Sequence, residues 1–283
     1  MTAAVTAPII RLEAVSKTYD LPRAGARGAA DRALNVVYDL SLDVQPREFV
    51  SIVGPSGCGK TTALFMLAGL REASAGRIEV CGRPPREAVR AGLSSVIFQQ
   101  PVLFEWLTAE ENVLLPLRMR DARWWAWPAR RGRYLAAARR ALETVELSGF
   151  EHYYPDALSG GMQQRVAIAR ALTLDPQVLL MDEPFGALDE ITRDRMNLEL
   201  IRLAEARGLT IVFVTHSIEE AVFLSDRVVV MSRGPSPATG SSVVRVLDVG
   251  LPHPRQLALK EEPAFFQKVR EGREALRQTQ GVA

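Results

Sequence analysis

Residues 49–70 read FVSIVGPSGCGKTTALFMLAGL, and this stretch decides the fold. An apolar run that favours a strand leads into a glycine-rich loop, after which a helix is expected to begin near Lys60. The loop at 54–61 fits the pattern G-x-x-x-x-G-K-[ST] in full, and its position between a strand and a helix is the context that identifies a phosphate-binding loop. The stretch therefore predicts an α/β protein that binds a nucleotide. The alternative is a tight strand–helix turn with a chance lysine.

The residues of this loop have separate expected tasks. Its three glycines let the backbone curl so that N–H groups converge on phosphate oxygens, and the start of the helix adds positive potential. Lys60 is expected to hold the β- and γ-phosphates, and the hydroxyl of Thr61 a Mg²⁺ ion. The expected cofactor-binding residues of the loop are Gly54, Pro55, Ser56, Gly57, Cys58, Gly59, Lys60, Thr61 and Thr62.

A second predicted strand, VLLMDE at 178–183, ends in two carboxylates. Its apolar residues favour a buried strand that emerges beside the phosphate loop. Asp182 is expected to anchor Mg²⁺ through water, and Glu183 to act as the general base that orients the attacking water. The alternative is a strand end with two solvated acids, which is less attractive beside a complete phosphate loop.

Three further residues near strands are weaker candidates. His216 in VTHS and Gln99 in IFQQP each stand at the end of a predicted strand, and ligands of open α/β sheets bind at the carboxyl ends of the strands. Tyr19 follows the first predicted strand, 9–15, and could stack on adenine or only pack. Each of these signals is weak when taken alone.

The composition is that of an ordinary globular protein. The chain has 283 residues, of which 47% are apolar and 24% charged, and its net charge is +2, so nucleic-acid binding has no global electrostatic support. The two cysteines, Cys58 and Cys81, are expected to be free thiols in a reducing compartment. No apolar run approaches the roughly 18 residues of a membrane span, and the start lacks the pattern of a signal peptide. A cytoplasmic chain is therefore expected.

Strand-like and helix-like runs alternate along most of the chain, which favours a mostly parallel sheet with helices on its faces. From about residue 108 the pattern becomes mostly helical, and this predicts a helical subdomain inserted into the sheet. The expected divisions are a main domain at 1–234 with a flexible loop at 25–33, the helical subdomain at about 100–174, and a C-terminal extension at 235–283 with a strand near 242–249 and a last helix near 263–277.

The stretch LSGGMQQRVAIAR, residues 158–170, has the features of a second phosphate cradle. Ser159 precedes two glycines and the start of a predicted helix. Its hydroxyl and the amides of Gly160 and Gly161 would therefore converge on an anion. A chain that binds one nucleotide has no evident use for two cradles about a hundred residues apart.

Taken together, these motifs resemble those of the ATP-binding subunit of ABC transporters, over roughly residues 9–232. The loop at 54–61 is similar to Walker A, VLLMDE to Walker B, LSGGM to the signature motif, and GALD at 186–189 to the D-loop. The resemblance implies a P-loop NTPase core of the ABC ATPase type, with an antiparallel β subdomain and an inserted α-helical subdomain. It also implies that two subunits sandwich ATP, so that the signature of one chain caps the nucleotide on the other chain's loop.

The resemblance also implies roles for individual residues. Gln99 matches the Q-loop, His216 the switch histidine, and Tyr19 the aromatic residue that stacks on adenine. The catalytic residues implied in this way are Glu183, His216 and Gln99, the Mg²⁺ ligands are Thr61, Gln99 and Asp182, and the further contacts with ATP are Ser159, Gly160, Gly161 and Asp189.

The runs FQQPVLFEWLTAEENV (98–113) and LPHPRQLALKEEPAFFQKV (251–269) resemble the importer branch that handles nitrate, sulfonates and taurine. That likeness implies an ATPase that powers import through integral membrane permease subunits, as a homodimer on the cytoplasmic face of the membrane. An extracytoplasmic solute-binding protein is then an indirect partner, and no nucleic acid is expected. The alternatives are a soluble ABC protein that acts on nucleic acid or ribosomes, and a P-loop kinase, which would leave LSGG and His216 without a role.

Two segments are candidate contacts with a membrane partner. Residues 99–107 contain four apolar residues that look exposed, Val102, Leu103, Phe104 and Trp106. The segment 121–133, DARWWAWPARRGR, could contact a membrane subunit or the bilayer interface, or only pack on the helical block. Two departures from the family pattern are Met162, where glutamine is common, and Arg47, which predicts a different turn but unchanged chemistry.

Overall fold

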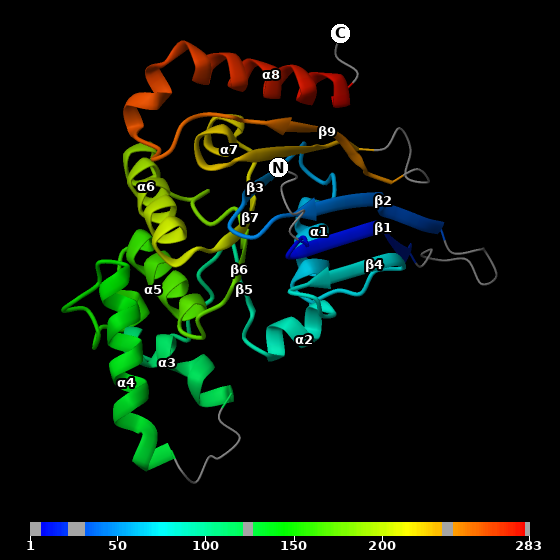
Figure 1. Ribbon diagram of the computed structural model, residues 1–283. Helices are drawn as coiled ribbons and strands as arrows, with labels where there is room; N and C mark the ends of the chain where they lie inside the picture. Colours follow the sequence, from blue (N-terminus) through cyan, green and yellow to red (C-terminus); the bar gives the residue numbers. More distant parts are fainter. Residues whose placement is uncertain (1–6, 22–31, 121–126, 234–239, 281–283) are drawn as a thin grey trace, which may run out of the picture.

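The computed structural model describes residues 7–21, 32–120, 127–233 and 240–280. Its main element is a six-stranded sheet in the order β5-β6-β7-β3-β8-β9 (Figure 1). The first five strands in this order are parallel, and β9 pairs antiparallel with β8 at the edge. The mostly parallel sheet expected from the sequence is confirmed. The strands are β5 (Ser94–Ile97), β6 (Val178–Asp182), β7 (Thr210–Val214), β3 (Phe49–Val53), β8 (Arg227–Met231) and β9 (Val243–Asp248).

Three adjacent strands of this sheet are buried along their whole length. Every residue of β6, β7 and β3 is inaccessible to solvent or nearly so. Helices cover both faces of a parallel sheet, so its strands carry continuous apolar runs and not an alternating pattern. Polar groups at the carboxyl ends of these strands are therefore the first that can reach a ligand.

A second, antiparallel sheet packs over helix α1 (Lys60–Leu67), in the order β2-β1-β4. Leu64 of α1 shares one buried core with Leu12 and Val37 of this sheet and with Val50 of the main sheet. Helix α1 therefore lies between the two sheets. The antiparallel sheet is the β subdomain that the family resemblance implied. Its strands are β1 (Ile10–Leu21), β2 (Arg32–Val44) and β4 (Ala75–Val80).

Helices α3 to α8 share the other large core with the main sheet. Leu142 of α4, Ile168 of α5, Phe213 of β7 and Phe265 of α8 all belong to this core. Helices α3, α4 and α5 pack on one another as a block that extends away from the sheet (Figure 1). The helices are α3 (Ala109–Arg120), α4 (Trp127–Thr144), α5 (Gly160–Leu172), α6 (Glu190–Arg207), α7 (Ile218–Leu224) and α8 (Pro263–Gln280), with the shorter α2 (Pro85–Arg90) and 3₁₀ turns at Pro155–Ala157 and Leu257–Glu261.

Residues 240–280 pack directly on the main sheet. Strand β9 pairs with β8, and α8 lies against α7. Gly272 permits this approach, since a Cβ at that position would lie 2.9 Å from Cγ2 of Ile218. The domain limits at 234 and at about 100–174 stay predictions.

Local structure differs from the sequence-based expectation in three places. Strand β1 extends to Leu21, so Tyr19 lies within it and not after it, because antiparallel pairing with β2 satisfies the backbone there. For the same reason β2 begins at Arg32, inside the loop expected at 25–33. Helix α2, which starts with Pro85 in its first turn, was not predicted. Arg47 has a φ of 66°, the left-handed conformation that favours glycine, and the different turn expected at this residue stays a prediction.

Within the described ranges, no helix has both the length and the apolar character that a membrane crossing requires. The tryptophan-rich segment falls largely on residues 121–126, which lie outside those ranges. Its two interpretations, a membrane contact or packing on the helical block, therefore both stay predictions.

Candidate nucleotide-binding and catalytic site

The loop at 54–59 connects the end of β3 to the start of α1, and its glycines are required by its geometry. Gly57 and Gly59 have φ values of 76° and 85°, which side chains rarely adopt. A Cβ at Gly54 would lie 2.6 Å from the carbonyl oxygen of Met231, and one at Gly59 would lie 2.8 Å from that of Val36. Only this glycine pattern allows the loop to pass between the neighbouring strands.

Lys60 places a cation at the centre of the loop. Its side chain is only 7% exposed, and its ammonium group donates hydrogen bonds to the carbonyl oxygens of Gly54 (2.9 Å) and Pro55 (3.2 Å). The first turn of α1 contains no acidic residue, so the positive end of the helix is not neutralised locally. Loop and lysine together form a site for a polyphosphate.

The other named residues of this loop contribute in different ways. The side chain of Cys58 is fully buried, and burial raises the pKa of its thiol despite the nearby charge of Lys60. Cys58 is therefore a packing residue that can offer a ligand only its backbone, while Ser56 and Thr62 are less buried. Both Cys58 and Cys81 are free thiols, as expected.

Thr61 and Asp182 meet although they are far apart in the sequence. The Thr61 hydroxyl donates a 3.1 Å hydrogen bond to Oδ1 of Asp182. Burial raises the pKa of Asp182, the Thr61 hydrogen bond lowers it, and the charge of Glu183 raises it again. Mg²⁺ prefers hard oxygen ligands and is commonly held by one or two carboxylates together with phosphates. Among the described residues no cluster of three or more His, Cys, Asp or Glu could hold a metal, so this oxygen pair is the one that fits an ion shared with phosphate.

Glu183 and His216 face each other at the ends of neighbouring strands. Glu183 Oε2 lies 3.2 Å from Nδ1 of His216, and both side chains remain accessible to solvent. Glu183 has a φ of 43°, and its N–H donates to the carbonyl oxygen of Val214 in β7. This backbone bond fixes a strained residue, a feature that is frequent at active sites.

Gln99 lies at the same edge. A Cβ at Gly186 would lie 3.9 Å from Nε2 of Gln99 and 3.8 Å from Oε2 of Glu183. The side chains of Gln99 and Glu183 therefore both lie beside Gly186. The structure thus places Gln99, Asp182, Glu183 and His216 at the carboxyl edge of β5, β6 and β7.

The second cradle, at the start of α5, does not face the first. Ser159 is the N-cap of α5 and its hydroxyl accepts a 3.3 Å hydrogen bond from the N–H of Met162. Ser159 and Gly160 are exposed, and the atoms nearest to a Cβ at Gly161 belong to Leu188 and Thr192. No residue of the loop at 54–59 is among those neighbours, so this helix start is open to another molecule.

Two further candidates have structural roles in this chain. Asp189 is the N-cap of α6 and accepts a 3.0 Å hydrogen bond from the N–H of Thr192, and such backbone hydrogen bonds lower the pKa of its carboxyl group. Tyr19 lies half-buried in β1, with the ammonium of Lys17 5.0 Å from the centre of its ring. Neither arrangement tests their expected contact with the nucleotide.

Arg233 was missed by sequence reasoning. It follows β8 directly, and its guanidinium donates to the carbonyl oxygen of Ser56 in the phosphate loop. A Cβ at Gly57 would lie 2.9 Å from the same guanidinium group. Its position just beyond the carboxyl end of a parallel strand is the signal that could have identified it.

The expectation that all four apolar residues of 99–107 are exposed is wrong for Leu103. Val102, Phe104 and Trp106 are 58%, 38% and 72% exposed, but Leu103 is partly buried and packs against the large core. The backbone of this segment is attached to α5. The guanidinium of Arg170 donates hydrogen bonds to the carbonyl oxygens of Pro101 and Val102, both at 2.9 Å. That attachment turns Leu103 inward while its neighbours remain at the surface.

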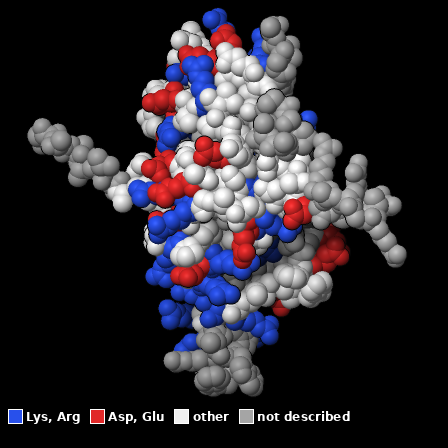
Figure 2. Space-filling view, turned by 90° about the vertical axis from the view of Figure 1, so that its right-hand side faces the viewer, with Lys and Arg blue, Asp and Glu red and all other residues white. Residues whose placement is uncertain are grey.

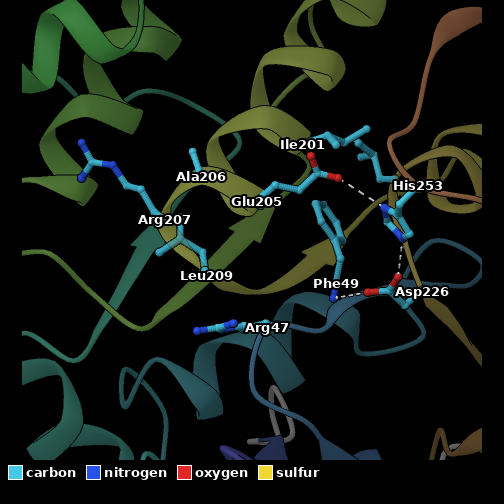
Figure 3. A pocket seen from close by; sticks show the side chains of 12 residues that line it. Arg47, Phe49, Ile201, Glu205, Ala206, Arg207, Leu209, Asp226 and His253 are labelled. Carbon is cyan, nitrogen blue, oxygen red and sulfur yellow. Dashed lines mark hydrogen bonds and ion pairs between the residues drawn. The ribbon is translucent and has the colours of Figure 1, made fainter.

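A cavity of about 540 Å³ lies at the opposite edge of the sheet (Figure 3). Its lining includes Phe49, the first residue of β3, whereas the phosphate loop follows the last residue of that strand. His253 stands between two carboxylates, with Nδ1 3.3 Å from Glu205 and Nε2 3.0 Å from Asp226. The volume suits a ligand, but none of the expected nucleotide-binding residues lines this cavity.

Glu220 is a buried acid near the catalytic edge and leads to a pH prediction. Burial raises its pKa above the ordinary value, although the Thr215 hydroxyl donates a 2.5 Å hydrogen bond to it. The folded protein therefore holds this proton more tightly than the unfolded chain does, and folding stability is lost as the pH rises from the unfolded pKa through the raised folded pKa. Relative to wild type, Glu220→Gln should become progressively more stable over that window.

Urea denaturation of both proteins from acid to neutral pH measures this difference. Exposed Glu143→Gln is the matched control and should show no comparable trend. A difference between Glu220→Gln and wild type that stays constant with pH would contradict the assignment of a raised pKa to Glu220.

Comparisons with known proteins agree on one family. Residues 37–186 match the family model described as ABC transporter. The chain is 40% identical over 241 residues to the aliphatic sulfonates import ATP-binding protein SsuB of Bacillus cereus, covering 84% of this chain and 87% of that protein. It is 36% identical over 271 residues to the nitrate import ATP-binding protein NrtD of Synechococcus elongatus, covering 94% and 90%. Among solved structures, the dimeric post-hydrolysis state of the ATP-binding cassette MJ0796 bound to ADP and Pi matches with a TM-score of 0.69 and 30% identity, covering 85% of this chain and 98% of that one.

Proposed function

The chain belongs to the ABC transporter family, and from this premise we propose that it is the ATP-hydrolysing subunit that powers import of a small solute through a separate membrane permease. The main observation in support of the proposal is that five residues lie together at one edge of the sheet: Lys60, Thr61, Asp182, Glu183 and His216. A phosphate loop, a carboxylate–hydroxyl pair and a general base are the parts that phosphoryl transfer to water needs.

The phosphate loop binds and orients ATP in this proposal. Backbone N–H groups of 54–61 and the ammonium of Lys60 hold the phosphates, and Arg233 supports the loop from its outer side. Thr61 and Asp182 hold Mg²⁺, with Gln99 as a further oxygen donor. When bound, the ion neutralises charge on the phosphates.

Glu183 accepts the proton of the attacking water, and its carboxylate is positioned for this by two contacts. The N–H of Glu183 is held by Val214, and its Oε2 faces the imidazole of His216. We therefore propose that His216 orients the carboxylate of Glu183. The side-chain amide of Gln99 is proposed to lie beside this carboxylate and the imidazole. Such a general base contributes about 10²- to 10⁴-fold to a rate.

The open cradle at Ser159 is proposed to complete the site of a second copy of this chain. Its hydroxyl, the amides of Gly160 and Gly161, and the positive end of a helix of 13 residues all favour a phosphate. Two copies would then bury two ATP molecules between them, each between one chain's loop and the other chain's cradle. The match to a dimeric cassette supports this arrangement.

The segment 101–107 is proposed as the surface that receives the permease. The rings of Phe104 and Trp106 contact each other at a tilt with centres 5.2 Å apart, and exposed apolar residues of this kind mark interaction sites. The buried amide of Asn112 fixes the segment through hydrogen bonds to the backbone of Phe104 and Leu107. Arg170 joins the same segment to α5, the helix that begins with the Ser159 cradle. The proposed location is therefore peripheral, on the cytoplasmic face of the membrane.

Trp106→Ala tests this docking surface. Exposed aromatic residues at the centre of an interface often contribute 2 kcal/mol or more, so binding to the permease should weaken by about 10- to 30-fold. Affinity for ATP should be unchanged, because Trp106 makes no contact with the phosphate loop among its described neighbours. Co-purification with the permease measures the effect, and Phe266→Ala on α8, another exposed aromatic residue, is the control. Unchanged assembly in Trp106→Ala would contradict the proposal.

The transported solute is proposed to be a small anion of the nitrate, sulfonate or taurine kind. The support is that two relatives are named as ATP-binding proteins for the import of aliphatic sulfonates and of nitrate. Identification of the solute captured by the partner binding protein tests this point, and a solute without a sulfonate or similar small oxyanion group would refute it.

The function as a whole is tested by what purifies with the chain. Co-purification with a polytopic membrane protein, together with Mg²⁺-dependent ATP hydrolysis, is the expected result. Recovery with ribosomes or nucleic acid and no membrane protein would instead favour the alternative of a soluble ABC protein.

A further inference from the structure

Positive charge is concentrated in one stretch of the chain. Residues 83–140 contain eleven arginines against five acidic residues, a net charge of +6, whereas the whole chain has a net charge of only +2. The rest of the molecule is therefore acidic on balance. This stretch includes α2, the segment 101–107 and α3.

Five exposed arginines lie on α2, on the turn before it and at the end of α3, and we call them the arginine patch: Arg83, Arg86, Arg90, Arg118 and Arg120. The guanidinium of Arg120, the last residue of α3, lies 2.9 Å from the position of a Cβ on Gly92, two residues beyond the end of α2. Helix α2 has six residues and is therefore only about 9 Å long. Figure 2 shows Lys and Arg gathered on one part of the face that it presents, where Asp and Glu are few.

The arginine patch adjoins the proposed permease-docking surface. Helix α3 starts two residues after the segment 101–107, and Asn112 in its first turns is bonded to that segment. Twelve helical residues span about 18 Å, so Arg120 at the end of α3 lies about that distance from the start of the helix beside the segment 101–107. A membrane that contains the permease is therefore near the patch when Trp106 docks.

The chemistry of the patch favours lipid over the permease as the partner. Cytoplasmic loops of membrane proteins carry an excess of Lys and Arg, so they would repel a surface of the same sign. The cytoplasmic leaflet carries anionic headgroups, each nearby Lys or Arg adding about 1 kcal/mol of attraction. Met119, between Arg118 and Arg120, is 77% exposed, and a long apolar side chain flanked by arginines suits the boundary between headgroups and acyl chains.

We propose that the arginine patch binds the anionic phospholipid headgroups of the membrane beside the permease. This proposal rests on the proposed function in one respect: the permease brings the subunit to a membrane. The contact would add to the docking energy of the segment 101–107 and fix the orientation of the subunit against the bilayer.

The test compares vesicle binding of two variants with equal net charge. The patch variant carries Arg→Gln at positions 83, 86, 90, 118 and 120, and the control variant carries Arg→Gln at the exposed positions 202, 245, 270, 273 and 277 on α6, β9 and α8. Flotation with vesicles of phosphatidylcholine plus phosphatidylglycerol, and with phosphatidylcholine alone, measures binding at low and high salt. The wild type should bind only the anionic vesicles, the patch variant at least about tenfold more weakly, and the control within about twofold of wild type.

Each other outcome overturns the proposal. An equal loss of vesicle binding in both variants would show that binding depends on net charge alone. If wild type binds neutral vesicles, or binds no vesicles, recognition of anionic headgroups is excluded. Loss of binding to an oligonucleotide with vesicle binding intact would assign the patch to nucleic acid. Melting curves and ATP binding confirm folding, and Arg118→Gln with Arg120→Gln is the milder variant if the fivefold change unfolds the protein. ATP hydrolysis and permease co-purification are measured in detergent, without a bilayer. They can therefore confirm the proposed function even if the vesicle experiment contradicts lipid binding.

Discussion

Glu183→Gln should bind ATP with near-normal affinity and lose about 10²- to 10⁴-fold of the hydrolysis rate. The amide keeps the shape of the carboxylate but cannot accept the proton of the attacking water. The phosphate loop and Lys60 are not altered, so binding has no reason to change. A steady-state ATPase assay and a separate measurement of nucleotide binding give the two quantities.

The same variant should accumulate as an ATP-bound dimer, because hydrolysis is the step that separates the two chains in the proposed cycle. Gel filtration with Mg–ATP detects this species. Exposed Glu143→Gln is the control and should hydrolyse ATP and elute like wild type. Near-normal turnover in Glu183→Gln would remove this carboxylate from the mechanism.

Ser159→Arg should reduce hydrolysis to background without weakening ATP binding by its own chain. The structure places Ser159 at an exposed helix start, where the atoms nearest to a Cβ at Gly161 belong to Leu188 and Thr192 and not to the phosphate loop. An arginine there fills the space proposed for the γ-phosphate of the second copy, so the dimer cannot close. Lys60→Ala should show the opposite behaviour and weaken binding within its own chain, because Lys60 lies at the centre of the loop.

Two controls separate this effect from damage to the fold. Loss of the hydrogen bond from Met162 to the N-cap costs about 1 kcal/mol, so melting curves must show that Ser159→Arg remains folded. Ser148→Arg adds the same side chain at another exposed position of the helical block and should remain active. When Ser159→Arg is combined with Glu183→Gln, no dimer should be trapped. If a well-folded Ser159→Arg monomer cannot bind ATP, both cradles serve the same chain and the sandwich arrangement is wrong.

The helical segment that contains Ser159 shows how far sequence patterns reach. A serine before two glycines predicts a helix N-cap, and the N-cap of α5 is observed there. The pattern cannot say which molecule the cap faces, because that depends on the packing of α5 against α6. In the same way, Leu103 looked exposed beside Val102, but it packs inward in a segment that Arg170 of α5 and Asn112 of α3 hold through hydrogen bonds.

By itself, the sequence determined the features that depend on neighbouring residues. The phosphate loop at 54–61, the helix that follows it and the buried strand before Asp182 all arise from local backbone freedom and continuous apolar runs. Only the tertiary structure decided which of these features meet: Thr61 with Asp182, Glu183 with His216, Arg233 with Ser56, and Arg120 of α3 with Gly92 beyond α2. The physical reason is that such contacts follow from the strand order β5-β6-β7-β3-β8 and from helix packing, which are selected by burial across the whole chain and leave no signature in any short stretch of it.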